Sequence, residues 1–272
     1  MRTRMAPRRF RHEGAIPRPK RGTQPKARSL ALHILLACSI ISACLAGYES
    51  ATAQRAALSY AAFSSEESRR EQGDTDGGEP DWNRLASVNE DVVGWLRLKT
   101  LGIDTPVVQQ RAGMEDNWYL THDIWGSPNP AGCPYLDPAS SIDGGHILVY
   151  GHNGGVGGGA FSPITSNDEA RSLAPTCTAE LRTPDGHART FLPLMSLNVS
   201  AAYDEIRSFP PSGGPEMHEL IRILGEDAAI KTREFDRATE SATEILSLVT
   251  CSQSTFATDR RTIMLFYIAD AP

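Results

Sequence analysis

Short apolar runs separated by turn residues dominate the pattern of hydrophobic and polar positions from residue 81 onward. β-branched and aromatic residues fill these runs, and Gly, Pro, Asp or Asn bounds each of them, as is typical of strands. The eight runs are VVGWLRL, IDTPVVQ, CPYLD, HILVYG, TAELRT, RTFLPLMSLNV, EILSLVTC and TIMLFYIA. This number of short strands, with few helices between them, predicts a closed or nearly closed β-barrel.

Two segments within this body break the strand pattern and predict helices. DWNRLASV offers Asp81 as an N-cap, followed by apolar residues at helical spacing. In PEMHELIRILGEDAAI, Pro215 stands in the first turn, where proline is tolerated. Four apolar residues of that segment share one helical face: Met217, Leu220, Ile221 and Leu224. The body is therefore predicted to be mostly β, with a few peripheral helices.

A different pattern occupies the first eighty residues. The stretch LALHILLACSIISACLAG at 30–47 has eighteen residues and no Asp, Glu, Lys or Arg, which is at the lower edge of the length that spans a bilayer. Residues 1–28 hold ten Lys/Arg against one acid, and a positive flank of this kind stays in the cytoplasm. We therefore predict a basic cytoplasmic tip at 1–29 and a transmembrane signal-anchor at 30–47. The C-terminal body would then lie outside the cell membrane, in a single-pass topology.

Residues 48–80 are rich in Ala, Ser, Glu, Arg, Gly and Asp and lack the apolar content of a core, so they predict an extracellular stalk before a folded domain at 81–272. Two processing alternatives stay open. ATA at 51–53 is a candidate signal-peptidase site, and ISAC at 41–44 resembles a lipoprotein box.

The charges are distributed unevenly between the two ends. Taking residues 1–28 from the totals of 27 Lys/Arg and 33 Asp/Glu leaves 17 and 32, so the rest of the chain is near −15 and the tip near +9. An acidic body does not favour an anionic polymer as partner, and the adjoining apolar run explains the basic tip, so no nucleic-acid partner is predicted.

The five cysteines show no CxxC spacing, which argues against a zinc ribbon or a dithiol redox motif, and no metal or cofactor is expected. Cys133 and Cys177 could pair in an oxidising exterior. Cys251 has no obvious partner.

The stretch LVTCSQSTFATDRRTIMLF ends one apolar strand on Cys251 and opens the next with Arg260 and Arg261. A free thiol has a pKa of about 8.5, so a nucleophilic cysteine needs a basic or positive neighbour. His152 stands where the strand HILVYG ends and a glycine-rich loop opens. Each residue alone is also explained by a structural role. Cys251 could be a core thiol, His152 a turn residue, and the two arginines a solvated strand edge. Together they are the parts that an acyl-transfer site requires.

The order of YGHN, SLVTC and an arginine at the start of the next strand resembles the sortases, whose cysteine lies in a TLxTC-like strand. NEDVVGWLRL, IDTPVVQ, DNWYL and GCPYLD resemble the N-terminal part of class B sortases in particular. The resemblance covers roughly residues 81–268 and implies a sortase-like closed eight-stranded β-barrel.

The resemblance also implies roles for individual residues. It makes Cys251 the nucleophile, His152 the general acid and base, and Arg261 the group that steadies substrate and oxyanion. Arg261 is preferred to Arg260 because it lies ten positions after the cysteine and directly precedes TIMLF. The implied substrate contacts are Asn117, Leu120, Tyr150 and Thr250.

Three positions depart from the family pattern. Ser247 replaces the usual Thr of TLxTC, Val249 stands where class B members often have Ser, and Cys133 stands where a small residue is common. These departures bear on substrate preference more than on chemistry.

The resemblance implies a membrane-anchored cysteine transpeptidase. Such an enzyme cleaves the C-terminal sorting signal of a secreted protein through a thioacyl intermediate and passes the acyl group to an amine, either a cell-wall precursor or a pilin lysine. Another cell-wall cysteine enzyme is the nearest alternative, but papain-like folds place Cys before His and L,D-transpeptidases carry a His-Gly-Cys motif that LVTC lacks. A tethered adhesin or scaffold with a structural cysteine is the alternative from another class.

Overall fold

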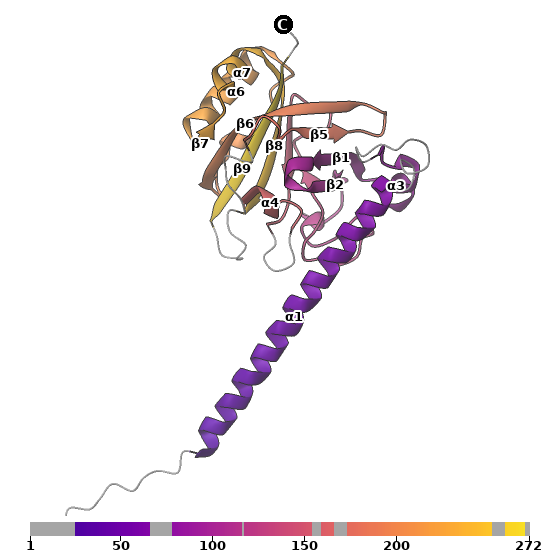
Figure 1. Cartoon of the computed structure of the whole chain (residues 1–272), viewed down its shortest axis with the longest axis vertical. Coiled ribbons are helices and arrows are strands. Elements are labelled where there is room, and N and C mark those ends of the chain that lie inside the picture. The colour runs from indigo at the N-terminus through magenta and orange to yellow at the C-terminus, as the bar shows by residue number, and fades with distance from the viewer. Residues whose placement is uncertain are drawn as a thin grey trace, which may run out of the picture. The chain divides into compact units, whose positions relative to one another are not determined.

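The computed structural model describes residues 25–65, 78–115, 117–153, 159–165, 173–251 and 259–269, in two units, Met1–Ala43 and Cys44–Pro272. Helix α1 (Pro25–Ser65) is one continuous helix (Figure 1). Its stretch Leu30–Tyr48 has 19 residues and is long and apolar enough to cross a membrane. The predicted apolar helix is therefore confirmed, whereas its insertion in a membrane stays a prediction. Most of the basic tip lies outside the described residues.

Eight strands close into a barrel in the order β5, β1, β2, β3, β4, β8, β9 and β6, and pairing of β6 with β5 completes the ring. Their bounds are β1 (Val92–Leu98), β2 (Ile103–Val108), β3 (Tyr135–Leu136), β4 (His146–Tyr150), β5 (Ala179–Arg182), β6 (Ala188–Ser200), β8 (Ala242–Cys251) and β9 (Arg260–Ala269). Each of the eight apolar runs overlaps one of these strands, so the predicted closed eight-stranded barrel is confirmed. A further strand, β7 (Ala228–Lys231), pairs with β6 outside the ring.

The helices of the body are short. They are α3 (Trp82–Val88), α4 (Ser162–Thr165), α6 (Gly214–Glu226) and α7 (Phe235–Ser241), with 3-10 turns η1 (Lys99–Leu101), η2 (Trp118–Leu120) and η3 (Glu205–Arg207). Asp81 caps α3 as predicted, because its carboxylate accepts a hydrogen bond of 2.9 Å from the Arg84 amide. The helix predicted over 215–230 ends at Glu226, and the chain then forms β7. Gly225 lies in the last turn, and the Phe235 ring packs so closely there that a Cβ at this position would lie 2.3 Å from it.

Alternate residues of the central strands fill two separate cores. In β8, Leu246 and Leu248 pack inside the barrel, whereas Ile245 and Val249 face outward. Helices α6 and α7 cover that outer face (Figure 1). Strand β8 is therefore buried on both faces over most of its length.

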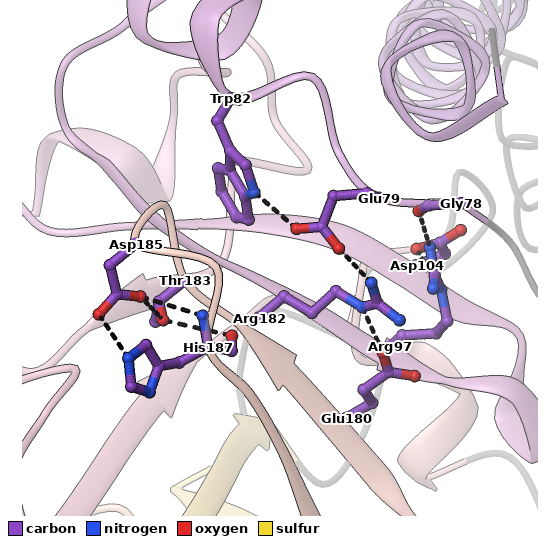
Figure 2. Close-up of polar contacts among 10 residues, drawn as sticks. All are labelled: Gly78, Glu79, Trp82, Arg97, Asp104, Glu180, Arg182, Thr183, Asp185 and His187. Carbon is purple, nitrogen blue, oxygen red and sulfur yellow. Dashed lines mark hydrogen bonds and ion pairs between the residues drawn. The ribbon is translucent and has the colours of Figure 1, made fainter. Parts of the chain in front are cut away.

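Charged contacts tie the segment before α3 to the barrel (Figure 2). Glu79 accepts hydrogen bonds from Arg182 of β5 and, at 2.8 Å, from the indole of Trp82. Arg97 of β1 is buried, and it donates to the Gly78 carbonyl at 3.3 Å. These bonds fix the place where the chain enters the barrel.

Candidate functional site

Cys251 and Arg261 face each other across neighbouring strands. Cys251 is the last residue of β8, and the antiparallel register pairs it directly with Arg261 near the start of β9. Residues paired in this way project to the same face of a sheet, with Cβ atoms about 5 Å apart. Both are half-buried, so the site is sheltered but open to solvent.

His152 lies beside the same end of β8. Strand β4 runs parallel to β8, with Tyr150 paired with Val249, and the Gly151 amide donates to the Val249 carbonyl at 3.0 Å. On the other side of His152, the Asn153 side chain donates to the Cys251 carbonyl at 2.9 Å. The residues on both sides of His152 are therefore bonded to the strand that carries the cysteine.

The imidazole of His152 has a defined orientation. Its Nε2 lies 2.8 Å from the Leu120 carbonyl oxygen, and because a carbonyl only accepts, Nε2 carries the proton. Nδ1 is then the ring nitrogen left for proton exchange. Gly151 allows the close packing behind this turn, since a Cβ there would lie 2.5 Å from the Phe161 ring.

The loop that presents the Leu120 carbonyl is tightly folded. Gly132 has a φ of +60°, and a Cβ on it would lie 2.8 Å from the Leu120 oxygen and 2.4 Å from the Tyr119 oxygen. The Cys133 amide donates to that Tyr119 oxygen at 2.9 Å. The hydroxyl of Tyr119 in turn donates to buried Asp91 at 2.6 Å. Backbone packing therefore sets the position of the carbonyl.

A pocket opens beside Arg261. It has a volume of about 70 Å³. Its lining is Tyr150, Val199, Ser200, Ala201, Tyr203, Asp204, Ile206, Arg207, Val249, Arg261 and Ile263. Val249 and Arg261 lie on the face of the sheet that also carries Cys251, so the pocket adjoins the cysteine.

The four predicted substrate contacts occupy different environments. Tyr150 lines the pocket, and Leu120 offers its carbonyl to His152. Asn117 is exposed and precedes η2 with a φ of 59°. Thr250 is 2% exposed, and it projects to the face of β8 opposite Cys251, so its side chain does not line the pocket.

The two candidate arginines differ in their contacts. Arg260 is exposed, and its guanidinium donates to the side chain of Asn198 at 2.6 Å. Arg261 donates to the Arg260 carbonyl at 3.1 Å and lines the pocket. Burial raises the pKa of Tyr135 to about 12, and the charges of Arg261 and Cys251 act on the same phenol in opposite directions. These observations favour Arg261 over Arg260 as the arginine of the site.

Two residues of this region, Asp137 and Arg207, were not predicted from the sequence. Arg207 of η3 donates through Nε to Oδ2 of Asp137 at 2.8 Å and through Nη2 to Oδ1 at 3.2 Å. The Tyr150 hydroxyl donates to the same carboxylate at 3.0 Å. Burial raises the pKa of Asp137, but the hydrogen bonds from Arg207, the Ala139 amide and Tyr150 outweigh it and leave that pKa below its usual range. The position of Asp137 directly after a strand in GCPYLD was the only signal available.

His146, at the other end of β4, is fully buried, and its hydrogen bonds stabilise the fold. Nδ1 lies 2.7 Å from the Ser208 carbonyl and therefore donates, which leaves Nε2 to accept from the Ser247 hydroxyl at 2.9 Å. Burial lowers the pKa of His146 to about 4, so it is neutral at pH 7. Ser247, which stands in place of the family threonine, supplies the hydroxyl for this bond.

The remaining cysteines of the body do not join the site. Cys133 and Cys177 are buried in separate core clusters and are not bridged to each other. Within the described residues there is no group of three or more His, Cys, Asp or Glu side chains placed to hold a metal ion.

The closed eight-stranded barrel matches the fold of class B sortases of known structure. The chain is similar to sortase B of Clostridium perfringens, with 21% identity, a TM-score of 0.55, and coverage of 68% of this chain and 97% of that one. It is also similar to sortase B from B. anthracis in complex with AAEK1, with 18% identity, a TM-score of 0.54, and coverage of 69% and 84%. A Staphylococcus aureus sortase B-substrate complex matches with 17% identity, a TM-score of 0.53, and coverage of 70% and 85%. No protein-family profile and no curated protein matches the sequence.

Proposed function

We propose that the chain is a sortase-type cysteine transpeptidase that acts at the outer face of the cell membrane. The observation that carries this proposal is the direct pairing of Cys251 with Arg261 across β8 and β9, beside His152 at the end of β4. A nucleophile, an acid and base, and a fixed cation are the groups that peptide-bond exchange requires.

The acylation step begins with attack of the Cys251 thiolate on the carbonyl carbon of the scissile peptide bond. Arg261 cannot lose its proton, so it donates hydrogen bonds to the oxyanion that forms. The carbon–nitrogen bond then breaks as His152 protonates the leaving amine through Nδ1. A thioester joins the acyl group to the sulfur, and the histidine is left neutral.

The second step reverses these roles. An incoming amine attacks the thioester carbonyl, and His152 accepts a proton from that amine. The carbon–sulfur bond breaks, and the thiolate and the imidazolium are regenerated. Throughout both steps the Leu120 carbonyl keeps the proton on Nε2, so the same ring nitrogen serves as acid and as base.

The substrate is a sorting-signal peptide of a secreted protein, and the acceptor is an amine of a cell-wall precursor or a pilin lysine. One similar structure is a sortase B-substrate complex, and another is sortase B complexed with triglycine. A Streptococcus pyogenes class B sortase involved in pilus biogenesis is similar as well, with 19% identity and a TM-score of 0.50. These relatives support a peptide donor and an amine acceptor.

The proposed arrangement along the chain is a cytoplasmic tip at 1–29, a transmembrane signal-anchor at 30–47, an extracellular stalk at 48–80 and a catalytic domain at 81–272. The 19-residue apolar stretch in α1 supports the anchor. In this arrangement the enzyme meets secreted proteins where they pause at the membrane.

The test uses the full chain in detergent with a panel of NPxTN-like and LPxTG-like peptides and separate amine acceptors. We expect one peptide class to be cleaved and joined to an amine, and Cys251→Ala to abolish both reactions with the fold intact. Full turnover by Cys251→Ala would refute the proposal. A wild-type Cys251 that no peptidyl electrophile modifies would instead favour a tethered adhesin with a structural cysteine.

A further inference from the structure

Asp137 is a buried carboxylate that joins two walls of the pocket beside Arg261. It lies directly after β3, and its amide donates to the Leu148 carbonyl of β4 at 2.9 Å, so the barrel fixes its backbone. Its side chain is 2% exposed and receives bonds from Arg207 and Tyr150. Both of these partners line the pocket, whereas Asp137 lies behind them.

The two walls come from separate parts of the chain. Tyr150 ends β4, two residues before His152, whereas Arg207 ends η3 in the connection that follows β6. Asp137 bridges these segments, because one carboxylate oxygen accepts both the Arg207 Nε–H and the Tyr150 hydroxyl. The distance between the walls therefore depends on a single acidic side chain.

The bond to Asp137 also sets which donors Arg207 presents. A guanidinium has five N–H groups, and the carboxylate uses two of them, on Nε and Nη2. The side chain is 49% exposed, so the other three can meet acceptors of a peptide in the pocket. A two-point contact of this kind holds the planar group in one orientation.

The charge of Asp137 has no other evident use. A buried carboxylate is costly unless it is paired and fully hydrogen-bonded, and here four donors satisfy it: Nε and Nη2 of Arg207, the Tyr150 hydroxyl and the Ala139 amide. A well-packed apolar residue would stabilise the fold as well at lower cost. Its place behind two residues that line the pocket fits a role in shaping that pocket.

We propose that Asp137 is a positioning residue of the peptide-binding pocket, which acts by holding Tyr150 and Arg207 at the spacing that a bound peptide requires. The inference rests on the proposed transpeptidase function. Because Asp137 acts on the walls and does not touch the cysteine, its loss weakens substrate binding and leaves the reactivity of the sulfur unchanged.

The test compares Asp137→Asn with Glu244→Gln in the full chain in detergent. Glu244 forms an ion pair of 2.9 Å with Arg189, and both side chains are largely buried. Glu244 lies seven residues before Cys251 on β8, which is about 23 Å at 3.3 Å per residue. Each substitution keeps the side-chain size and removes the charge opposite an arginine. Glu244→Gln therefore controls for the loss of a buried ion pair as such.

Three quantities are measured: steady-state cleavage of a peptide that the wild type accepts, modification of Cys251 by iodoacetamide, and modification by a peptidyl electrophile of the same sequence. For Asp137→Asn we expect KM to rise about tenfold with kcat within about twofold. Peptidyl modification should slow about tenfold while iodoacetamide modification keeps its wild-type rate. Glu244→Gln should keep all of these values. Should Asp137→Asn fail to fold, Tyr150→Phe removes the hydroxyl bond to Asp137, keeps the ring that lines the pocket and should give the same pattern.

A variant that loses thermal stability but keeps the wild-type KM and the wild-type ratio of the two modification rates would overturn the inference, because Asp137 would then serve the fold alone. Equal effects in Asp137→Asn and Glu244→Gln would overturn it as well. A wild-type Cys251 inert to both reagents would overturn the proposed function, and the inference with it.

Discussion

The buried His146 makes the stability of the body depend on pH in a way that can be worked out from the structure. Its pKa falls from an unfolded value of 6.5 to about 4 because burial disfavours the charged ring. Between these values the unfolded chain holds a proton that the folded chain does not, so acid favours unfolding. The stabilising contribution is complete above pH 6.5 and is lost as the pH falls to about 4. A difference of about 2.5 pKa units corresponds to roughly 3 kcal/mol.

His146→Asn removes this titration and keeps an amide that can donate to the Ser208 carbonyl. At pH 7.5 we expect the variant to be about 1–3 kcal/mol less stable, because the bond to the Ser247 hydroxyl is lost. The difference should shrink as the pH falls towards 4, since only the wild type loses the histidine contribution. Contributions from titratable groups that do not act on His146 are common to both proteins and cancel in the comparison.

The assay is urea unfolding of the full chain in detergent at pH values from 4 to 7.5, followed by tryptophan fluorescence. All four tryptophans lie between residues 82 and 125, so the signal reports on the body and not on α1. Parallel plots of unfolding free energy against pH for the two proteins would refute the assignment of a buried neutral histidine.

Three further predictions concern the site. Arg261→Lys should lower kcat for peptide cleavage about a hundredfold, because a fixed oxyanion donor is lost. Arg260→Lys should keep kcat within about twofold of the wild type. If steady-state kinetics showed the reverse, Arg260 would be the arginine of the site. Gly151→Ala should lower both activity and melting temperature, since its Cβ would lie 2.5 Å from the Phe161 ring, and wild-type values for both would contradict the packing described. Thr250→Val should leave KM unchanged and raise the free energy of unfolding by up to about 1 kcal/mol. The reason is that the buried Thr250 hydroxyl has no hydrogen-bond partner in the described structure. A raised KM would show that the side chain contacts the substrate.

Local pattern was enough to predict the barrel strands. Each apolar run was bounded by residues that end a strand, and this signal does not depend on the rest of the fold. Strand β7 was missed because AAIK is short, and only Asp227 separates it from a helix whose predicted segment ran on to Ile230. The register that pairs Cys251 with Arg261 could not be predicted from the ten-residue spacing alone, and their roles stay proposals.

Contacts between distant parts of the chain could not be predicted in the same way. Asp137 and Arg207 are seventy positions apart in the sequence. Nothing in the local sequence of either residue distinguishes it from an ordinary charged loop residue, and only the fold brings the two together. Thr250 is a different case, because the structure buries its side chain. Alternation along β8 places it on the face opposite Cys251, and this period-two signal was present in the sequence.

The group that orients His152 is a main-chain carbonyl, and this affects how the site tolerates mutation. An orienting carboxylate can be lost by one codon change, whereas a carbonyl is present whichever residue stands at position 120. The sequence of this loop can therefore drift as long as the path of its backbone is kept. That path depends on Gly132, where any side chain would collide with two backbone oxygens. A mutation of Gly132, twenty positions before His152 in the sequence, is therefore the change most damaging to the orientation of that histidine.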